Sequence, residues 1–189
     1  MYEYCCHLEP GNTNRLNINA LVPFKYEDPI RKMILQFKYY YNFKHCRFFA
    51  YHMSKAINLY LNHCLYKEVI LVPVPLSSEK LFQRGYNQAF ILCEYISKYI
   101  ENVNIELLLV KNQNISQKDS RYMDRFGNSN NIILCDNVDF SIINNKCIIL
   151  IDDVIASGAT VNQCIQELES MNYKYRLNNH IIVSAISII

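Results

Sequence analysis

Glycine and proline are scarce in this sequence, with 4 and 5 copies among 189 residues. So little of either residue argues against long flexible linkers and low-complexity segments. No repeat with the period of a solenoid is present either. A chain of this length buries about two thirds of its unfolded surface, and 51% of its residues are hydrophobic. We therefore expect one full hydrophobic core.

Excess charge and long apolar runs are also missing. The formal net charge is +2, which is too small to predict nucleic-acid binding from global electrostatics. The apolar runs have the length of strands, far short of the roughly 20 residues that cross a bilayer. The start, from Met1 to Cys6, lacks the basic and then apolar pattern of a signal peptide. These absences predict a cytoplasmic protein with no membrane span.

The sequence also lacks the cysteine spacing of a zinc site. Eight cysteines are present, but no pair has the C-x-x-C pattern. Cys5, Cys6 and His7 are potential ligands, yet adjacent residues rarely share one tetrahedral site. Cysteines of a protein that is not exported usually remain free thiols. We therefore expect no zinc.

The first part of the chain, residues 1–67, is predicted to be an irregular and helical segment that packs on the core. Residues 1–28 show no regular pattern and are expected to be irregular. Asp28 before Pro29 is a good N-cap and first residue for a helix. That helix has apolar residues at spacings of three and four, namely Ile30, Met33, Ile34 and Phe37. A second helix is predicted over about residues 46–65.

The second part, residues 68–189, alternates short apolar strands with helices. Residues 69–75 are wholly apolar and end in prolines, which fits a central parallel strand that stops at its carboxyl end. Further strands are predicted over 106–110, 132–134, 147–151 and 180–189, and helices over 87–100 and 160–171. This alternation is typical of an α/β fold, a parallel sheet flanked by helices. Ligands of such sheets bind at the carboxyl ends of the strands.

The segment 148–160 carries the clearest chemistry, because an apolar strand is followed by two carboxylates and a small-residue loop that opens a helix. A helix start offers unpaired N–H groups and a positive dipole end, which suit a phosphate. Gly158 lets the backbone approach a ligand, and Ser157 and Thr160 add hydroxyl donors. Asp152 and Asp153 offer oxygen atoms for ribose hydroxyls or Mg²⁺. Each piece alone is commonly a cap or a turn, but the combination predicts a sugar-phosphate site.

These thirteen residues resemble the signature of type I phosphoribosyltransferases, which bind phosphoribosyl pyrophosphate (PRPP). The resemblance implies a phosphoribosyltransferase-type, Rossmann-like fold for residues 68–189. It implies that Asp152 and Asp153 hold the ribose hydroxyls, directly or through Mg²⁺. The residues that would hold the 5′-phosphate are Ala156, Ser157, Gly158, Ala159 and Thr160. A plain dinucleotide-binding domain would need G-x-G-x-x-G after its first strand, and that pattern is absent.

Motifs upstream resemble, more narrowly, the ComF family of phosphoribosyltransferases, also called the GntX or competence protein F family. They are Pro-Val-Pro-Leu at 73–76, Arg-Gly-Tyr-Asn-Gln at 84–88 and Phe-Lys-Tyr at 24–26 and 37–39. With the signature, these blocks cover most of residues 24 to 170. Members of the family commonly begin with a four-cysteine zinc module, a pattern that this sequence does not contain. The resemblance implies a role in DNA uptake during natural transformation, with competence proteins as partners.

A pyrophosphate site is expected beside the 5′-phosphate loop. Pro75 and Leu76 end a strand there, and Arg84 would neutralise the pyrophosphate and act in catalysis with the two aspartates. Asn87 either caps its helix or contacts the ligand. The polar stretch 111–131 is long enough to be functional or mobile. Its cations Lys111, Lys118, Arg121 and Arg125 are expected to close over the leaving group, with a solvated loop as the alternative.

Two functions remain open. An enzyme would displace pyrophosphate from the anomeric carbon of PRPP by a nitrogen nucleophile, with Mg²⁺. Ala156 stands where some purine-salvage relatives carry an aspartate, so the sequence identifies neither a base catalyst nor an acceptor. The alternative is a non-catalytic module that binds PRPP or a nucleotide and handles single-stranded DNA. Lys38, Lys44 and Arg47 lie among aromatic residues, which suits backbone neutralisation and base stacking; two ordinary amphipathic helices are the simpler explanation.

Overall fold

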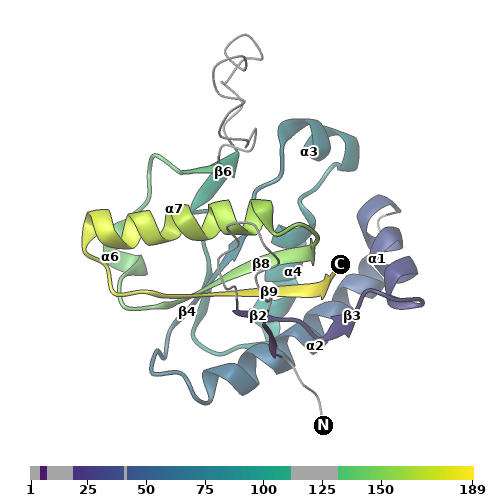
Figure 1. Cartoon of the computed structure of the whole chain (residues 1–189), viewed down its shortest axis with the longest axis horizontal. Coiled ribbons are helices and arrows are strands. Elements are labelled where there is room, and N and C mark those ends of the chain that lie inside the picture. The colour runs from purple at the N-terminus through teal and green to yellow at the C-terminus, as the bar shows by residue number, and fades with distance from the viewer. Residues whose placement is uncertain (1–4, 8–18, 41, 112–131) are drawn as a thin grey trace.

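Parallel strands form the centre of the main sheet (Figure 1). The computed structural model describes residues 5–7, 19–40, 42–111 and 132–189. The strand order is β1-β2-β9-β8-β4-β5, and β3 also pairs with β9. The four neighbours that run parallel are β9 (His180–Ile188), β8 (Cys147–Ile155), β4 (Val69–Pro73) and β5 (Val103–Ile105). The α/β fold expected from the sequence is confirmed.

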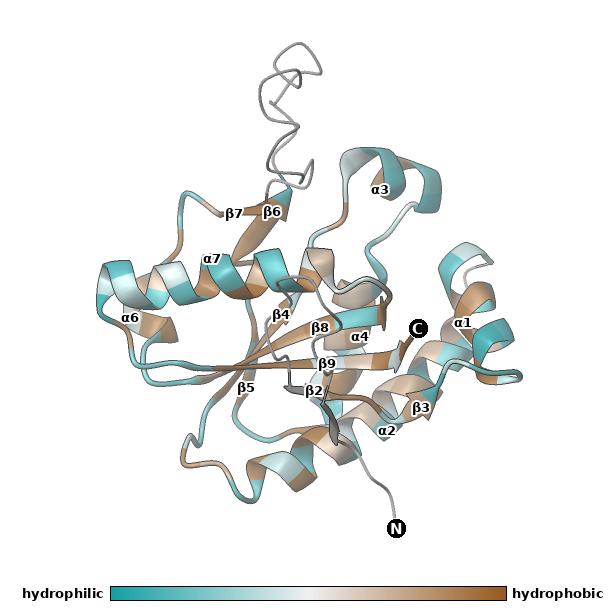
Figure 2. Ribbon diagram, in the orientation of Figure 1, coloured by the Kyte–Doolittle hydropathy of each residue, from teal (hydrophilic) through white to brown (hydrophobic). Residues whose placement is uncertain are grey.

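Helices cover both faces of this sheet. One face packs on α1 (Ile30–Tyr39), α2 (Phe43–Leu61) and α4 (Gln88–Ile96), and the other on α6 (Phe140–Ile143) and α7 (Ala159–Tyr175). Successive strand residues point to opposite faces. Leu71 and Ile149 therefore join the first core, while Ile70 and Leu150 join the second. Because both faces are buried, β4 and β8 are apolar along most of their length (Figure 2).

The start of the chain also contributes to the sheet, so the expectation that residues 1–28 are irregular was wrong. The described part forms β1 (Cys5–His7), β2 (Asn19–Leu21) and β3 (Phe24–Lys25). β2 and β3 pair parallel with β9, and β1 pairs antiparallel with β2. Ser184 and Ser187 of β9 donate side-chain hydrogen bonds of 3.0 Å to the carbonyls of Leu21 and Phe24. Strands of two or three residues are too short to show a periodic pattern.

Asp28 does not cap α1, contrary to the sequence prediction. The N-cap residue is Pro29, in helical conformation and without a side-chain cap. The Asp28 carboxylate accepts from Arg31 Nε at 3.1 Å and pairs with Lys32 Nζ at 3.0 Å. Two cations in the first turn thus take the carboxylate that was expected to cap the backbone. The second helix, α2, begins and ends a few residues earlier than predicted.

The strand predicted over 106–110 lies mostly outside the main sheet. β6 (Leu109–Lys111) pairs antiparallel with β7 (Ile132–Leu134) in a separate two-stranded sheet. The edge of the main sheet is β5 instead. Leu108 and Leu109 are buried against the α7 side of the core, a choice of neighbour that local apolarity cannot specify. Across the described ranges, none of the helices is long and apolar enough to cross a membrane.

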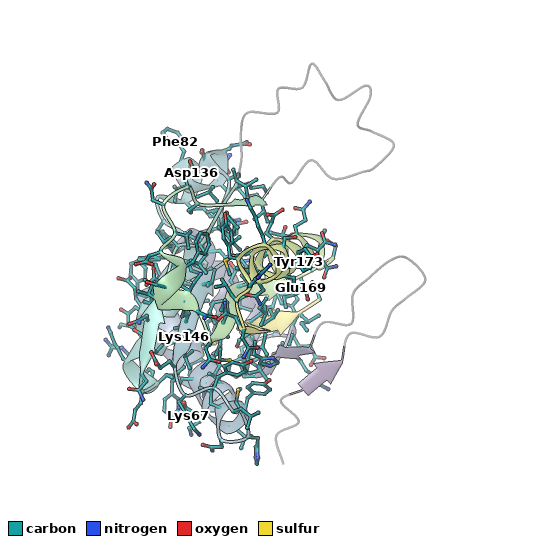
Figure 3. The ribbon with its side chains drawn as sticks, turned by 90° about the vertical axis from the view of Figure 1, so that its left-hand side faces the viewer. Lys67, Phe82, Asp136, Lys146, Glu169 and Tyr173 are labelled. Atoms are coloured by element: carbon teal, nitrogen blue, oxygen red, sulfur yellow. The ribbon has the colours of Figure 1, made fainter. Side chains whose placement is uncertain are left out.

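Two turns of helix were not expected from the sequence. The predicted helix over 87–100 is α4 followed by a single 3-10 turn, Ser97–Tyr99. Before it lies α3 (Ser78–Arg84), which begins at Ser77, whose side chain accepts from Lys80 N at 3.4 Å. α3 ends at Gly85, where φ is 73°. Figure 3 shows Phe82 of α3 at the opposite end of the molecule from Lys67, which precedes β4.

Candidate functional site

β8 extends beyond the end of its neighbour β4 and so brings its carboxylates to the edge of the sheet. The β4–β8 pairing stops at Pro73 and Ile151, whereas the β8–β9 pairing continues to Ile155. Asp152 and Asp153 thus lie within a strand, not after it as the sequence analysis expected. Figure 2 shows the change from apolar to polar near this end of β8. Since β4 has already ended, the space beside the two aspartates is open.

A cleft of about 240 Å³ lies at this carboxyl edge. Its walls come from the segments after β4 and β8, the starts of α4 and α7, and the ends of α1 and β6. The structure brings together all the residues predicted for the diacid, the 5′-phosphate and the pyrophosphate. They are Pro75, Leu76, Arg84, Asp152, Asp153, Ala156, Ser157, Gly158, Ala159 and Thr160. Lys118, Arg121 and Arg125 of the predicted loop lie outside the described residues.

The start of α7 has the form of an anion seat. Gly158 occupies the N-cap position with φ of 73°, a conformation that a side chain makes costly. A Cβ built there would meet nothing within 4 Å, so the backbone angle, not crowding, calls for glycine. The first intrahelical bond runs from Asn162 N to Gly158 O at 2.8 Å. The N–H groups of the first turn have no partner within the helix, and this end of α7 lines the cleft.

The two aspartates differ in their surroundings. The Asp152 carboxylate accepts from the backbone N–H of Asp153 at 2.7 Å. Burial, and then the neighbouring Asp153 carboxylate, raise the pKa of Asp152 to about 7. Asp153 is 7% exposed, and its Oδ1 pairs with the ammonium of Lys38 at 2.9 Å. The pair thus carries less than its full negative charge at neutral pH.

Lys38 lies in the cleft and not on an outer nucleic-acid surface with Lys44 and Arg47, as the sequence interpretation had it. Its side chain is 18% exposed, while Lys44 and Arg47 are exposed on α2. The reason is the packing of the end of α1 on the α3–α4 junction. Tyr86 donates from its hydroxyl to the carbonyl of Phe37.

Arg84 is oriented by two neighbours before any ligand is considered. It donates from Nη1 to Gln88 Oε1 at 3.0 Å and from Nη2 to the Tyr39 hydroxyl at 3.4 Å. Its guanidinium carbon also lies 5.2 Å from the centre of the Tyr39 ring. Gln88 is 2% exposed, so this support is largely buried. Such preorganisation suits a cation that meets phosphate oxygens.

Asn87 serves as a cap in this structure. Its side chain accepts from Ala89 N at 2.9 Å and donates to the carbonyl of Val74 at 3.0 Å. Of the two roles considered from the sequence, helix capping is the one that these contacts show. The amide thereby fixes the start of α4 against the end of β4, although Asn87 also lines the cleft.

Two further lysines line the cleft. Lys111, expected in a mobile loop, is the last residue of β6, and Lys80, which the sequence analysis missed, lies in α3. Burial, and then the charge of Lys80, lower the pKa of Lys111. The signal that was available for Lys80 is its place in a polar run between the 73–76 and 84–88 motifs. Without α3, that run reads as a surface loop.

The donor set is compatible with Mg²⁺ only in part. Asp152 and Asp153 offer the carboxylate oxygens that this ion prefers. Within the ranges that the structure describes, no three side chains of metal-binding type converge. An ion at this position would therefore take most of its oxygen ligands from a bound phosphate compound or from water. This fits a metal that arrives with its ligand.

A parallel sheet that presents a helix start and two carboxylates to one cleft is typical of α/β proteins that bind phosphorylated ligands. Comparison with known proteins points to a narrower group. The chain is 27% identical over 154 residues to competence protein F of Haemophilus influenzae, covering 77% of this chain and 64% of that protein. It is 32% identical over 108 residues to ComFC of Bacillus subtilis, covering 53% and 40%. These relatives confirm the resemblance to the ComF family.

Similarity to a third relative and to solved structures is comparable in extent. ComFC of Streptococcus pneumoniae is 26% identical over 152 residues, covering 80% of this chain and 62% of that protein. The chain thus spans between 40% and 64% of the length of these relatives. No family model matches it. A hypoxanthine phosphoribosyltransferase of Staphylococcus aureus has a TM-score of 0.46 at 11% identity, covering 76% and 74%. The purine phosphoribosyltransferase of Pyrococcus horikoshii has 0.39 at 11%, covering 75% and 84%.

Proposed function

We propose that this protein binds PRPP in the cleft at the carboxyl edge of its sheet. The 5′-phosphate would be held by amide and hydroxyl groups of residues 156–160, and the ribose hydroxyls by Asp152 and Asp153. The pyrophosphate would lie against the backbone of Pro75 and Leu76 and the guanidinium of Arg84. The observation that carries this proposal is that one cleft is lined by all three groups of residues.

Transfer of the phosphoribosyl group is the activity for which this cleft would be suited. A nitrogen nucleophile would form a bond to the anomeric carbon while the bond to pyrophosphate breaks, and pyrophosphate would leave with the electron pair. Arg84 would stabilise the charge that grows on the leaving group. Bound Mg²⁺ would add charge neutralisation at the same group. Asp152 and Asp153 would hold the ribose as its ring carbon becomes electron-poor.

The nucleophile is the open part of the proposal. Ala156 has no group that can transfer a proton, and the remaining titratable side chains in the cleft are Lys38, Lys80, Arg84, Lys111 and the two aspartates. The names of the relatives connect them with competence, so we place the activity in the uptake or processing of transforming DNA, alongside other competence proteins. Pyrophosphate release, followed across a panel of nucleobases, separates an enzyme from a protein that only binds PRPP.

Thermal denaturation tests the binding site. PRPP with Mg²⁺ is expected to raise the melting temperature, because a ligand that binds only the native state stabilises it. Asp153→Asn combined with Gly158→Val should abolish the increase while the protein remains folded by circular dichroism. An unchanged increase in this double variant would show that PRPP binds elsewhere. No increase for the wild-type protein, at PRPP concentrations up to millimolar, would overturn the proposed function.

A second candidate, handling of single-stranded DNA, is favoured by the outer face of α2. Lys44 and Arg47 are exposed there, and three aromatic rings beside them remain partly accessible. They are Phe43, Phe48 and Tyr51, with exposed fractions of 39%, 39% and 41%. Cations that neutralise phosphates and rings on which bases stack are the common means of binding single strands. Lys38 does not belong to this face.

Fluorescence anisotropy with labelled oligothymidylate tests this second candidate. Lys44→Glu combined with Arg47→Glu should weaken binding and make it less dependent on salt, since fewer counterions are released. Lys67→Glu combined with Lys174→Glu is a matched control, because it makes the same change of charge at exposed positions away from α2. Equal weakening by both pairs would mean that charge alone, and not this face, determines the affinity.

A further inference from the structure

Three lysines from three separate elements line the same cleft: Lys38 of α1, Lys80 of α3 and Lys111 of β6. With Arg84, the cleft walls hold four cations against two carboxylates. The whole chain has a formal net charge of +2, so the positive charge is concentrated locally. None of the three lysines belongs to the signature loop at 148–160.

Lys80 and Lys111 have no carboxylate to balance them. In the part of the chain that the structure describes, neither forms an ion pair. Lys111 is only partly accessible, and the nearby charge of Lys80 adds to the effect of burial in lowering its pKa. Two cations close together without an anion are mutually repulsive. A bound anion would relieve this repulsion.

Lys38 connects the other two lysines with the aspartates. Its ammonium lies 2.9 Å from Asp153 Oδ1. Its position depends on backbone contacts, because Gln88 Nε2 donates to the Lys38 carbonyl at 3.5 Å and Tyr86 donates to the preceding carbonyl. The charges of Lys38 and Lys80 both act on Asp152. All three lysines therefore belong to one charged region beside the diacid.

We propose that Lys38, Lys80 and Lys111 form a second anion subsite, which takes the pyrophosphate end of a sugar that is phosphorylated at two positions. The inference rests on the proposed function and adds the residues that distinguish such a ligand from a sugar with one phosphate. The seat at residues 156–160 offers neutral amide and hydroxyl donors. The lysines offer compact charges with three donors each, which suit a group of high negative charge.

Two simple probes separate the two seats by isothermal titration calorimetry. Inorganic pyrophosphate reports on the lysines, and ribose 5-phosphate reports on the start of α7. Lys80→Met combined with Lys111→Met should weaken pyrophosphate binding at least tenfold and leave ribose 5-phosphate within twofold. Ser157→Ala combined with Thr160→Ala should do the reverse. Lys38→Met is measured in an Asp153→Asn background, so that no carboxylate is left unpaired, and should weaken pyrophosphate binding relative to Asp153→Asn alone.

Lys32→Met is the matched control for loss of one positive charge, since Lys32 lies on α1 and pairs with Asp28 instead of lining the cleft. It should leave both affinities unchanged. The lysine subsite is overturned if the Lys80 and Lys111 double variant binds pyrophosphate like wild type, or loses both probes equally. If wild type binds pyrophosphate through the lysines but does not bind ribose 5-phosphate or PRPP, the proposed function fails while the subsite stands. Wild type that binds no probe overturns both.

Discussion

The side-chain amide of Asn87 joins two elements that form the cleft, donating to the carbonyl of Val74 at 3.0 Å while accepting from Ala89 N at 2.9 Å. One residue thus ends the segment after β4 and begins α4. Both bonds are made by a partly buried side chain, so neither group is easily replaced by water. The Pro75–Leu76 segment follows Val74 directly, and its place in the cleft depends on this connection.

Asn87→Ala should lower the free energy of unfolding by about 1–2 kcal/mol, because it removes a helix cap and leaves a partly buried carbonyl without its donor. Urea denaturation measures this change. Asn87→Asp is the informative control, since it keeps the acceptor for Ala89 N but cannot donate to Val74. A smaller loss for Asp than for Ala is expected. Equal losses would mean that the cap contributes nothing and that the bond to Val74 carries the whole effect.

Gly158→Ala should reduce PRPP affinity at least tenfold while costing only about 1–2 kcal/mol of stability. The stability cost follows from the left-handed backbone, where φ is 73°, and not from a clash, since no atom lies within 4 Å of the added Cβ. The affinity loss follows because the methyl group would occupy space at the phosphate seat. Gly85→Ala imposes the same strain at φ 73° away from that seat. Similar affinity losses in both variants would attribute the effect to strain alone.

The sequence allowed the phosphate seat to be predicted because its chemistry is local. Strand, carboxylates, glycine and helix start follow one another between residues 148 and 160, and each constrains its neighbours. The extent of β8 could not be predicted in this way. Asp152 and Asp153 remain in the strand because β9 continues beside them to Ile188, a partner that no local pattern specifies.

The N-terminal part shows the same limit more strongly. α1 was predicted from its periodicity, yet the location of Lys38 depends on contacts with residues 86 and 88, some 50 positions away. Lys38 was therefore grouped with its sequence neighbours Lys44 and Arg47, although it lies in the cleft. β2 and β3 were missed because they are strands only by pairing with β9 at the far end of the chain.

Asp152→Asn should change how stability depends on pH in buffer that contains EDTA. The native pKa of Asp152 is raised from 3.8 to about 7, so the folded wild type binds this proton more tightly than the unfolded chain does. Its contribution is fully present below about pH 4 and is lost as pH rises toward 8. The variant has no such loss, so its melting temperature relative to wild type should increase across this range. Each kcal/mol corresponds to about 2–4 °C. The exposed Asp136→Asn should show a constant difference, and a constant difference for Asp152→Asn as well would contradict the shift.

Thiol alkylation should report on the two cores, because burial raises the pKa of Cys46 and of Cys147 to about 12. Both side chains are fully buried, and the thiolate is the reactive form, so at pH 8 iodoacetamide should not modify them in the folded protein. Cys64 is partly accessible and serves as the internal comparison in peptide mass spectrometry. Urea should abolish the difference between the three. Modification of Cys147 at the rate of Cys64 in native buffer would show that the edge of the sheet near residue 147 opens readily, contrary to its buried position between β4 and β9.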